Sequence, residues 1–160
     1  SNLNFKKLYS LIKKTYFSEN INNLPLITKL NGIYNLESKF KGRITNKNGE
    51  VLFEDVKLGK NKTIYFNARI IEFGKNGKVQ FNLVKKVQRK KNLSQKIEIK
   101  GFLIPSSSRI VFENFLINGS ELSVKKVKEY ENKFVDELIQ DSLVDIFNES
   151  KINKYFKNLF

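Results

Sequence analysis

Apolar and polar residues alternate with a period of two over most of residues 30–120, and this period is typical of β-strands with one dry face. The clearest strand has apolar residues at Tyr34, Leu36, Phe40 and Ile44, separated by Asn35, Glu37, Lys39, Lys41 and Arg43. Similar patterns follow at residues 51–53, 64–73, 79–83, 97–103 and 110–117. About six strands at such short spacing predict an antiparallel meander.

Turn residues separate these strands. The stretch from Gly74 to Gly77 predicts a hairpin, and the stretch from Pro105 to Ser108 predicts a second turn. Around Ile70 the apolar residues change from even to odd positions, which a β-bulge would explain.

The two ends of the chain instead show the spacing of three to four residues that amphipathic helices have. Near the N-terminus this spacing predicts a helix over residues 3–17, followed by a loop before Pro25. After Gly119 it predicts a helix of several turns, whose apolar residues are Val127, Tyr130, Phe134, Val135, Leu138, Ile139, Leu143, Ile146 and Phe147. Ser150 is predicted to be the N-cap of a second, short helix with Ile152, Tyr155, Phe156 and Leu159 on its apolar side.

Together these elements predict an α+β fold, in which a curved, antiparallel β-sheet meander of about six strands has an N-terminal helix and C-terminal amphipathic helices. Residues 1–24 form the N-terminal helix and loop, residues 25–122 the β-sheet domain, and residues 123–160 the helical tail. We expect the apolar stripes of the helices to cover one face or end of the sheet. The alternative is that they meet a membrane surface or a partner protein.

The composition argues against catalysis. The sequence has no His and no Cys, so it lacks the commonest general base, the usual zinc ligands and the nucleophile or base of the familiar triads. Its acidic residues are scattered over strands, turns and the polar side of the C-terminal helix, without the pairing of an acid and a base or the clustering of a metal site. We therefore expect a protein that is not an enzyme and that uses no metal or cofactor.

The net charge of +14 suggests an anionic partner, although a solvated coat of lysines in an Asn-rich chain is the favoured explanation. The dense basic cluster, interpreted as a loop, consists of Lys85, Lys86, Arg89, Lys90 and Lys91. Two interpretations of this cluster are a solvated hairpin tip and a contact for anionic lipid headgroups. Nucleic-acid binding is not favoured, because the Phe residues occupy positions that suit a buried face and not base stacking. No apolar run approaches the roughly 18 residues that span a bilayer.

Several phrases of the sequence resemble the C-terminal repeat region of AsmA-like proteins, where a glycine, a short strand and a second glycine precede an Asn-Gly turn and another strand. Residues 30–36 begin the first phrase, Phe40 to Gly42 continue it, and Asn48 to Val56 end it. Residues 76–81 repeat its last part, and residues 100–103 with 110–112 fit a closing pair of strands. The resemblance covers about residues 30–120. AsmA-like proteins are anchored in the inner membrane of Gram-negative bacteria, and the apolar groove of their periplasmic β-structure is implicated in moving phospholipid.

The resemblance implies a non-enzymatic domain of the cell envelope, periplasmic or associated with the inner membrane, that binds or guides lipid acyl chains or scaffolds such a groove. It would be part of a longer chain, and the Ser at position 1 indicates the same. The residues expected to face lipid are Tyr34, Leu36, Phe40, Ile64, Phe66, Val79, Phe81 and Leu83. The expected partners are phospholipid or a membrane surface, and after them other envelope proteins. Two other functions stay open: a basic nucleic-acid-binding module, and a structural domain that binds a partner through its sheet edge or C-terminal helix.

Overall fold

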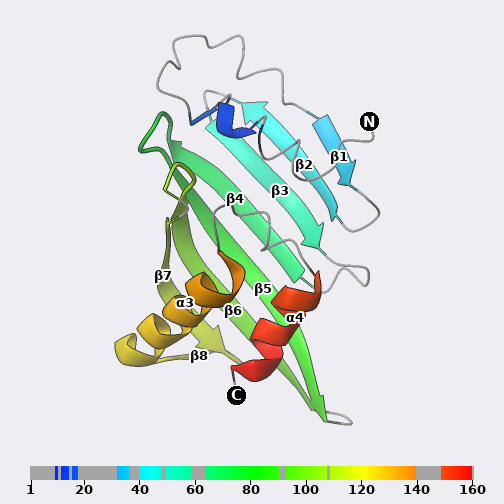
Figure 1. Cartoon of the computed structure of the whole chain (residues 1–160). Coiled ribbons are helices and arrows are strands. Elements are labelled where there is room, and N and C mark those ends of the chain that lie inside the picture. The colour runs from blue at the N-terminus through cyan, green and yellow to red at the C-terminus, as the bar shows by residue number, and fades with distance from the viewer. Residues whose placement is uncertain are drawn as a thin grey trace.

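The protein folds as an eight-stranded antiparallel sheet with two C-terminal helices (Figure 1). This computed structural model describes residues 10, 12–14, 16–17, 32–36, 40–47, 50–58, 64–90, 93–107, 109–139 and 149–159. The strands are β1 (Gly32–Leu36), β2 (Phe40–Lys47), β3 (Glu50–Leu58), β4 (Ile64–Glu72), β5 (Lys78–Lys90), β6 (Leu93–Ile104), β7 (Arg109–Ile117) and the two-residue β8 (Ser120–Glu121). Each strand pairs with its neighbours in the sequence, and the sheet is open, with β1 and β8 at its ends. The predicted α+β class and the meander are confirmed.

The stretch that was predicted as one strand over residues 34–44 is in fact two. β1 and β2 form a hairpin in which Leu36 is paired with Phe40 and Tyr34 with Gly42. Paired residues of antiparallel strands project to the same face. Because both pairs join even positions, the alternation continues unchanged through the chain reversal. The period of two therefore locates the strands here but does not show where the chain turns.

Among the described residues, register shifts interrupt five of the strand pairings. The bulge predicted near Ile70 is confirmed, since the register between β4 and β5 shifts between Ile70 and Glu72. A second shift lies in β3 between Phe53 and Val56, where Asp55 has a positive φ of 53°. A third lies between β6 and β7 next to Gly101. Bulges bend and twist a sheet locally, which suits a sheet that curves around a core on one side.

The first C-terminal helix, α3 (Val124–Leu138), begins after Ser123, whose Oγ accepts a hydrogen bond from the backbone N–H of Lys126 at 3.3 Å. Its buried residues are Tyr130, Glu131, Phe134 and Leu138. The second, α4 (Glu149–Asn158), buries Ile152, Tyr155 and Phe156, and Leu159 directly after the helix is buried as well. This is the apolar side that the spacing predicted.

Some predictions for the helices differ from the structure or lie outside it. Ser150 lies within α4 and not at its N-cap, because the helix already includes Glu149. Leu143, Ile146 and Phe147 lie outside the described residues. In the N-terminal stretch, Ser10, residues 12–14 and Tyr16 are helical, as predicted, and the remainder of residues 3–17 lies outside the described part of the chain or, like Phe17, follows the helix.

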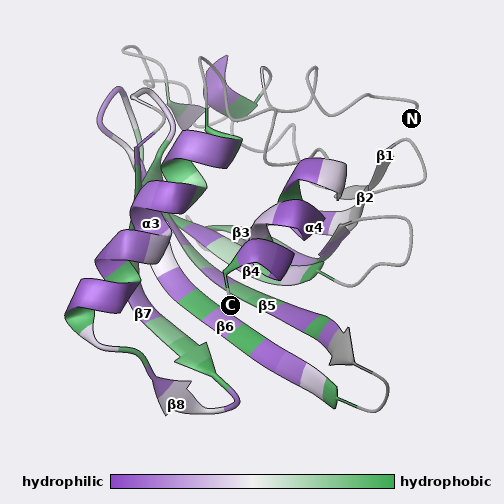
Figure 2. Cartoon of the chain, turned by 60° about the horizontal axis from the view of Figure 1, so that its bottom comes forward, coloured by the Kyte–Doolittle hydropathy of each residue, from purple (hydrophilic) through white to green (hydrophobic). Residues whose placement is uncertain are grey.

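Both α3 and α4 lie on the same side of the sheet, which we call the inner face (Figures 1 and 2). α3 packs on β7, and α4 lies beside α3 and reaches β5. Figure 2 shows that hydrophobic and hydrophilic residues alternate along β6 and that the exposed surfaces of both helices are largely hydrophilic. The expectation that the helices cover part of the sheet is therefore met for residues 124–138 and 149–158.

Candidate apolar site on the inner face

Five of the residues expected to face lipid lie on the inner face of the sheet. The register pairs Phe66 with Leu83, and Ala68 with Phe81, so the β4 and β5 residues of this set project to one side. Ile64 and Val79 extend the same face toward its two ends. Tyr34, Leu36 and Phe40 belong to β1 and β2 by their backbone, and their side chains lie outside the described residues.

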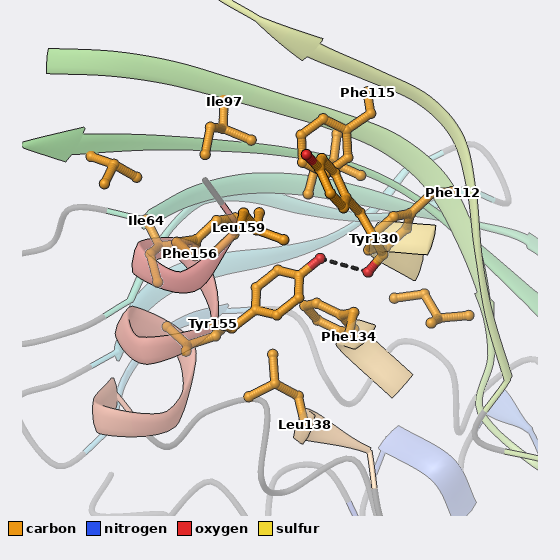
Figure 3. Packing of buried hydrophobic residues seen from close by; sticks show 14 of the residues in the cluster. Ile64, Ile97, Phe112, Phe115, Tyr130, Phe134, Leu138, Tyr155, Phe156 and Leu159 are labelled. Carbon is orange, nitrogen blue, oxygen red and sulfur yellow. Dashed lines mark hydrogen bonds between the residues drawn. The ribbon is translucent and has the colours of Figure 1, made fainter. Parts of the chain in front are cut away.

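One end of the inner face is filled by the main core of the protein. Its aromatic residues come from β7 and both helices and make tilted or edge-to-face contacts (Figure 3). Phe134 is central, with ring centroids 5.4 Å from Phe112 and 5.1 Å from Tyr155. Ile64, only 1% exposed, belongs to this core. Ile64 is therefore covered by the protein itself and is not available to a ligand.

The other end of the inner face holds a smaller core. Tyr16 and Phe17 pack there against Ile44, Val51 and Ile70, which come from β2, β3 and β4. Gly74 donates its backbone N–H to the carbonyl oxygen of Tyr16 at 2.9 Å, so the β4–β5 turn is tied to this end.

A row of phenylalanines lies between the two cores. Phe53, Phe66 and Phe81 are half-buried, and they come from the adjacent strands β3, β4 and β5. Phe53 packs against both cores, and Val79 packs beside it against the smaller one. The inner face thus has two closed ends and a middle at which three rings keep part of their surface accessible.

Phe53 was not among the predicted site residues. The apolar positions of β3 are odd at Val51 and Phe53 and even at Val56, so no single alternation joins them. The shift of register at Asp55 explains the change. The available signal was the Asp itself, since Asp adopts positive φ more readily than most residues.

The two helices are joined by a buried hydrogen bond. The hydroxyl of Tyr155 in α4 donates to the backbone carbonyl oxygen of Tyr130 in α3 at 2.7 Å (Figure 3). Burial raises the pKa of the Tyr155 phenol, and the charge of Glu137 and the neighbouring Tyr130 raise it further. The hydroxyl therefore stays protonated and can donate throughout the neutral pH range.

Replacing Tyr155 by Phe is expected to lower the free energy of unfolding by about 1 kcal/mol, because the hydrogen bond between the helices is lost while the ring stays packed. Urea denaturation followed by circular dichroism measures this difference. Tyr65→Phe is the matched control. Tyr65 is 43% exposed, so removal of its hydroxyl breaks no buried hydrogen bond. Equal stability of the two variants would show that the bond between the helices contributes nothing.

The basic cluster differs from its prediction. Residues 85–90 are not a loop, because β5 continues to Lys90 and pairs with β6. Lys85 is buried at 6% exposure, in the row between Ile64 and Ile97, so it cannot serve as a headgroup contact on the surface. Lys86 is exposed; the side chains of Arg89 and Lys90, and Lys91 as a whole, lie outside the described residues. The misassignment arose because a run of lysines hid the alternation of Lys85 and Val87, which share a face.

A hollow of about 320 Å³ lies between β7, β8 and the start of α3. Four of the polar side chains that line it are paired. Buried Glu131 accepts a hydrogen bond from the backbone N–H of Phe112 at 2.8 Å and forms an ion pair with Lys128 at 2.8 Å. Glu121 accepts a hydrogen bond from the side-chain amide of Asn114 at 3.1 Å. The bond from Phe112 holds α3 against β7, and the bond from Asn114 joins β7 to β8. We assign this hollow a structural role.

Among the described residues, no group of three or more acidic residues could hold a metal ion, and no helix is long and apolar enough to cross a membrane. Comparison with known proteins gives no match among family models, curated proteins or solved structures. The resemblance to AsmA-like proteins thus stays a hypothesis that rests on the sequence phrases alone.

Proposed function

We propose that this protein is a non-catalytic domain that binds a lipid acyl chain on the middle of its inner face. The observation that carries the proposal is the row of half-buried rings of Phe53, Phe66 and Phe81 between two closed cores. An extended hydrocarbon chain that lies across this row would remove the remaining apolar surface from water, at about 25 cal/mol for each Å².

The accessible middle of the inner face suits the binding of a single acyl chain. It suits contact with a whole bilayer, or a role as part of a long groove, less well. The main core blocks the inner face at Ile64, and Tyr16 and Phe17 block it at the opposite end. We therefore restrict the predicted contact set to Phe66, Val79, Phe81 and Leu83, and add Phe53. The resemblance of residues 30–120 to AsmA-like proteins supports a lipid ligand and, with it, a place in the cell envelope.

Titration with a dansyl-labelled fatty acid tests the proposal directly, because the sequence contains no Trp and its own fluorescence stays low. We expect saturable binding of one chain for each protein molecule. Phe66→Asn should weaken the affinity for the fatty acid about tenfold, because a polar amide replaces an apolar contact that contributes about 1–2 kcal/mol.

Tyr65→Asn is the matched control. Tyr65 is the preceding residue of β4, and it projects to the opposite face and is exposed. Denaturation curves must first show that both variants are folded at the temperature of the titration. If the chain binds neither labelled fatty acid nor lipid detectable by native mass spectrometry, or if both variants bind alike, the inner face is not a lipid site.

A further inference from the structure

The hairpin of β5 and β6 extends past the strands on either side of it (Figure 1). Among the described residues, pairing with β4 ends at Lys85 and pairing with β7 ends at Ile97. Next to Ile97, the backbone N–H of Asn118 donates to the carbonyl oxygen of Lys96, and the side-chain oxygen of Asn118 accepts from the backbone N–H of Lys96. Beyond these rows, residues 86–90 pair only with residues 93–96 within the described part of the sheet. We call these two segments the basic ribbon.

Positive charge is concentrated on the ribbon in a way that costs stability. Residues 86–96 contain five Lys or Arg residues and no acidic residue. Lys86 lies directly opposite Lys96, and like charges at directly opposed positions repel each other. Lys96 is paired with Glu98 at 2.9 Å, whereas Lys86 forms no ion pair with any residue that the structure describes.

An apolar residue lies near the tip of the ribbon. Leu93 is 60% exposed, among the most exposed of the large hydrophobic residues in the described chain. Residues 86–96 contain no aromatic side chain on which a base could stack. Alternation along β6 directs Leu93 to the face of the ribbon opposite Lys86 and Lys96. A ribbon that meets an anionic bilayer with its tip would therefore place the apolar side chain toward the hydrocarbon while the charges of both faces meet the headgroups.

We propose that the basic ribbon docks the protein on an anionic membrane surface, with Leu93 inserted between the headgroups. The site is separate from the row of phenylalanines on the inner face and does not require that an acyl chain be bound there. The two sites together would place the domain at the surface from which a lipid is taken or to which it is delivered.

Sedimentation with vesicles tests the ribbon. We expect the full chain to bind vesicles of equal parts phosphatidylglycerol and phosphatidylcholine and not vesicles of phosphatidylcholine alone, with binding that weakens as salt is raised. The double variant Lys86→Gln with Lys96→Gln should weaken partitioning about 25-fold, at about fivefold for each lysine near the surface. Leu93→Ser should weaken it about tenfold.

Lys100→Gln with Lys125→Gln is the matched control, because it removes the same charge from exposed positions on the sheet and on α3. It should change partitioning by less than about twofold. The ribbon variant should be about as resistant to urea as the wild-type chain, since relief of the repulsion between the opposed lysines offsets the lost ion pair of Lys96 with Glu98. A loss of binding together with retained stability is not an effect of unfolding.

The proposal is overturned if the control pair weakens binding as much as the ribbon pair, or if the vesicles are not bound at low salt. It is also overturned if a short oligonucleotide, and not the vesicles, is bound through the ribbon lysines. Titration of the ribbon variant with the dansyl-labelled fatty acid separates the two sites. If the ribbon variant binds the labelled fatty acid with unchanged affinity but no longer binds vesicles, the ribbon serves docking alone. If it loses affinity for the fatty acid as well as for vesicles, the two sites are not separate.

Discussion

Replacing Phe134 by Ala is expected to lower the free energy of unfolding by about 3–5 kcal/mol, because it leaves a cavity where the helices meet the sheet. Phe134 is 3% exposed, and its ring contacts Phe112 of β7 and Tyr155 of α4. Ala favours a helix more than Phe does, so the loss measures packing and not helix propensity. Urea denaturation followed by circular dichroism is the measurement.

Lys133→Ala is the control for this variant, since Lys133 precedes Phe134 in α3 and, within the described residues, makes one exposed ion pair, with Glu129 at 3.9 Å. Its effect should stay below about 0.5 kcal/mol. If Phe134→Ala and Lys133→Ala are equally stable, α3 does not pack on the sheet as described, and Phe134 is not at the centre of the main core.

Replacing Gly101 by Ala is expected to lower the free energy of unfolding by about 3 kcal/mol, near the upper end of what overpacking costs. A Cβ atom at this position would overlap the carbonyl oxygen of Val111 and lie 3.2 Å from the ring of Phe81. Because the first neighbour is backbone of the paired strand, β6 and β7 must separate at the bulge. The same denaturation experiment measures the loss.

Gly74→Ala is the contrasting control. A Cβ atom at Gly74 meets nothing within 4 Å, but the residue has a φ of +98°, so the cost is conformational and about 1–2 kcal/mol. Gly101 has no such φ, and its expected cost is steric. If Gly101→Ala is the milder of the two variants, the close approach of β6 and β7 at Val111 is not real.

The strands were predictable wherever one face is dry and the alternation is uninterrupted. The hairpin at Gly74, the bulge at Ile70 and the apolar side of α4 all follow from local periods and turn residues. The division of residues 34–44 into β1 and β2 was not predictable, because the hairpin preserves the parity of the apolar positions. The start of α4 was missed by one residue or more, which is usual where caps alone set the boundary.

The candidate site was predictable in part. Phe66 and Phe81 followed from alternation, while Phe53 was hidden by the bulge at Asp55. The exposed fraction of each side chain was harder to predict than the face on which it lies. Ile64 and Phe66 are two positions apart on one strand and share a face, yet the first is buried and the second half-buried. No local pattern distinguishes them, because the difference depends on where the helices lie.

The sequence by itself determined that this chain forms an antiparallel meander with apolar residues on one face, since period and turn chemistry act between near neighbours. It also determined the absence of His and Cys and, with it, the narrow range of chemistry open to the protein. Only the tertiary structure decided which part of the apolar face stays accessible and that Lys85 is buried while Lys86 is exposed on a projecting ribbon. Burial is a property of elements that are distant in the chain and meet in space, so it cannot be read from the spacing of residues within one strand.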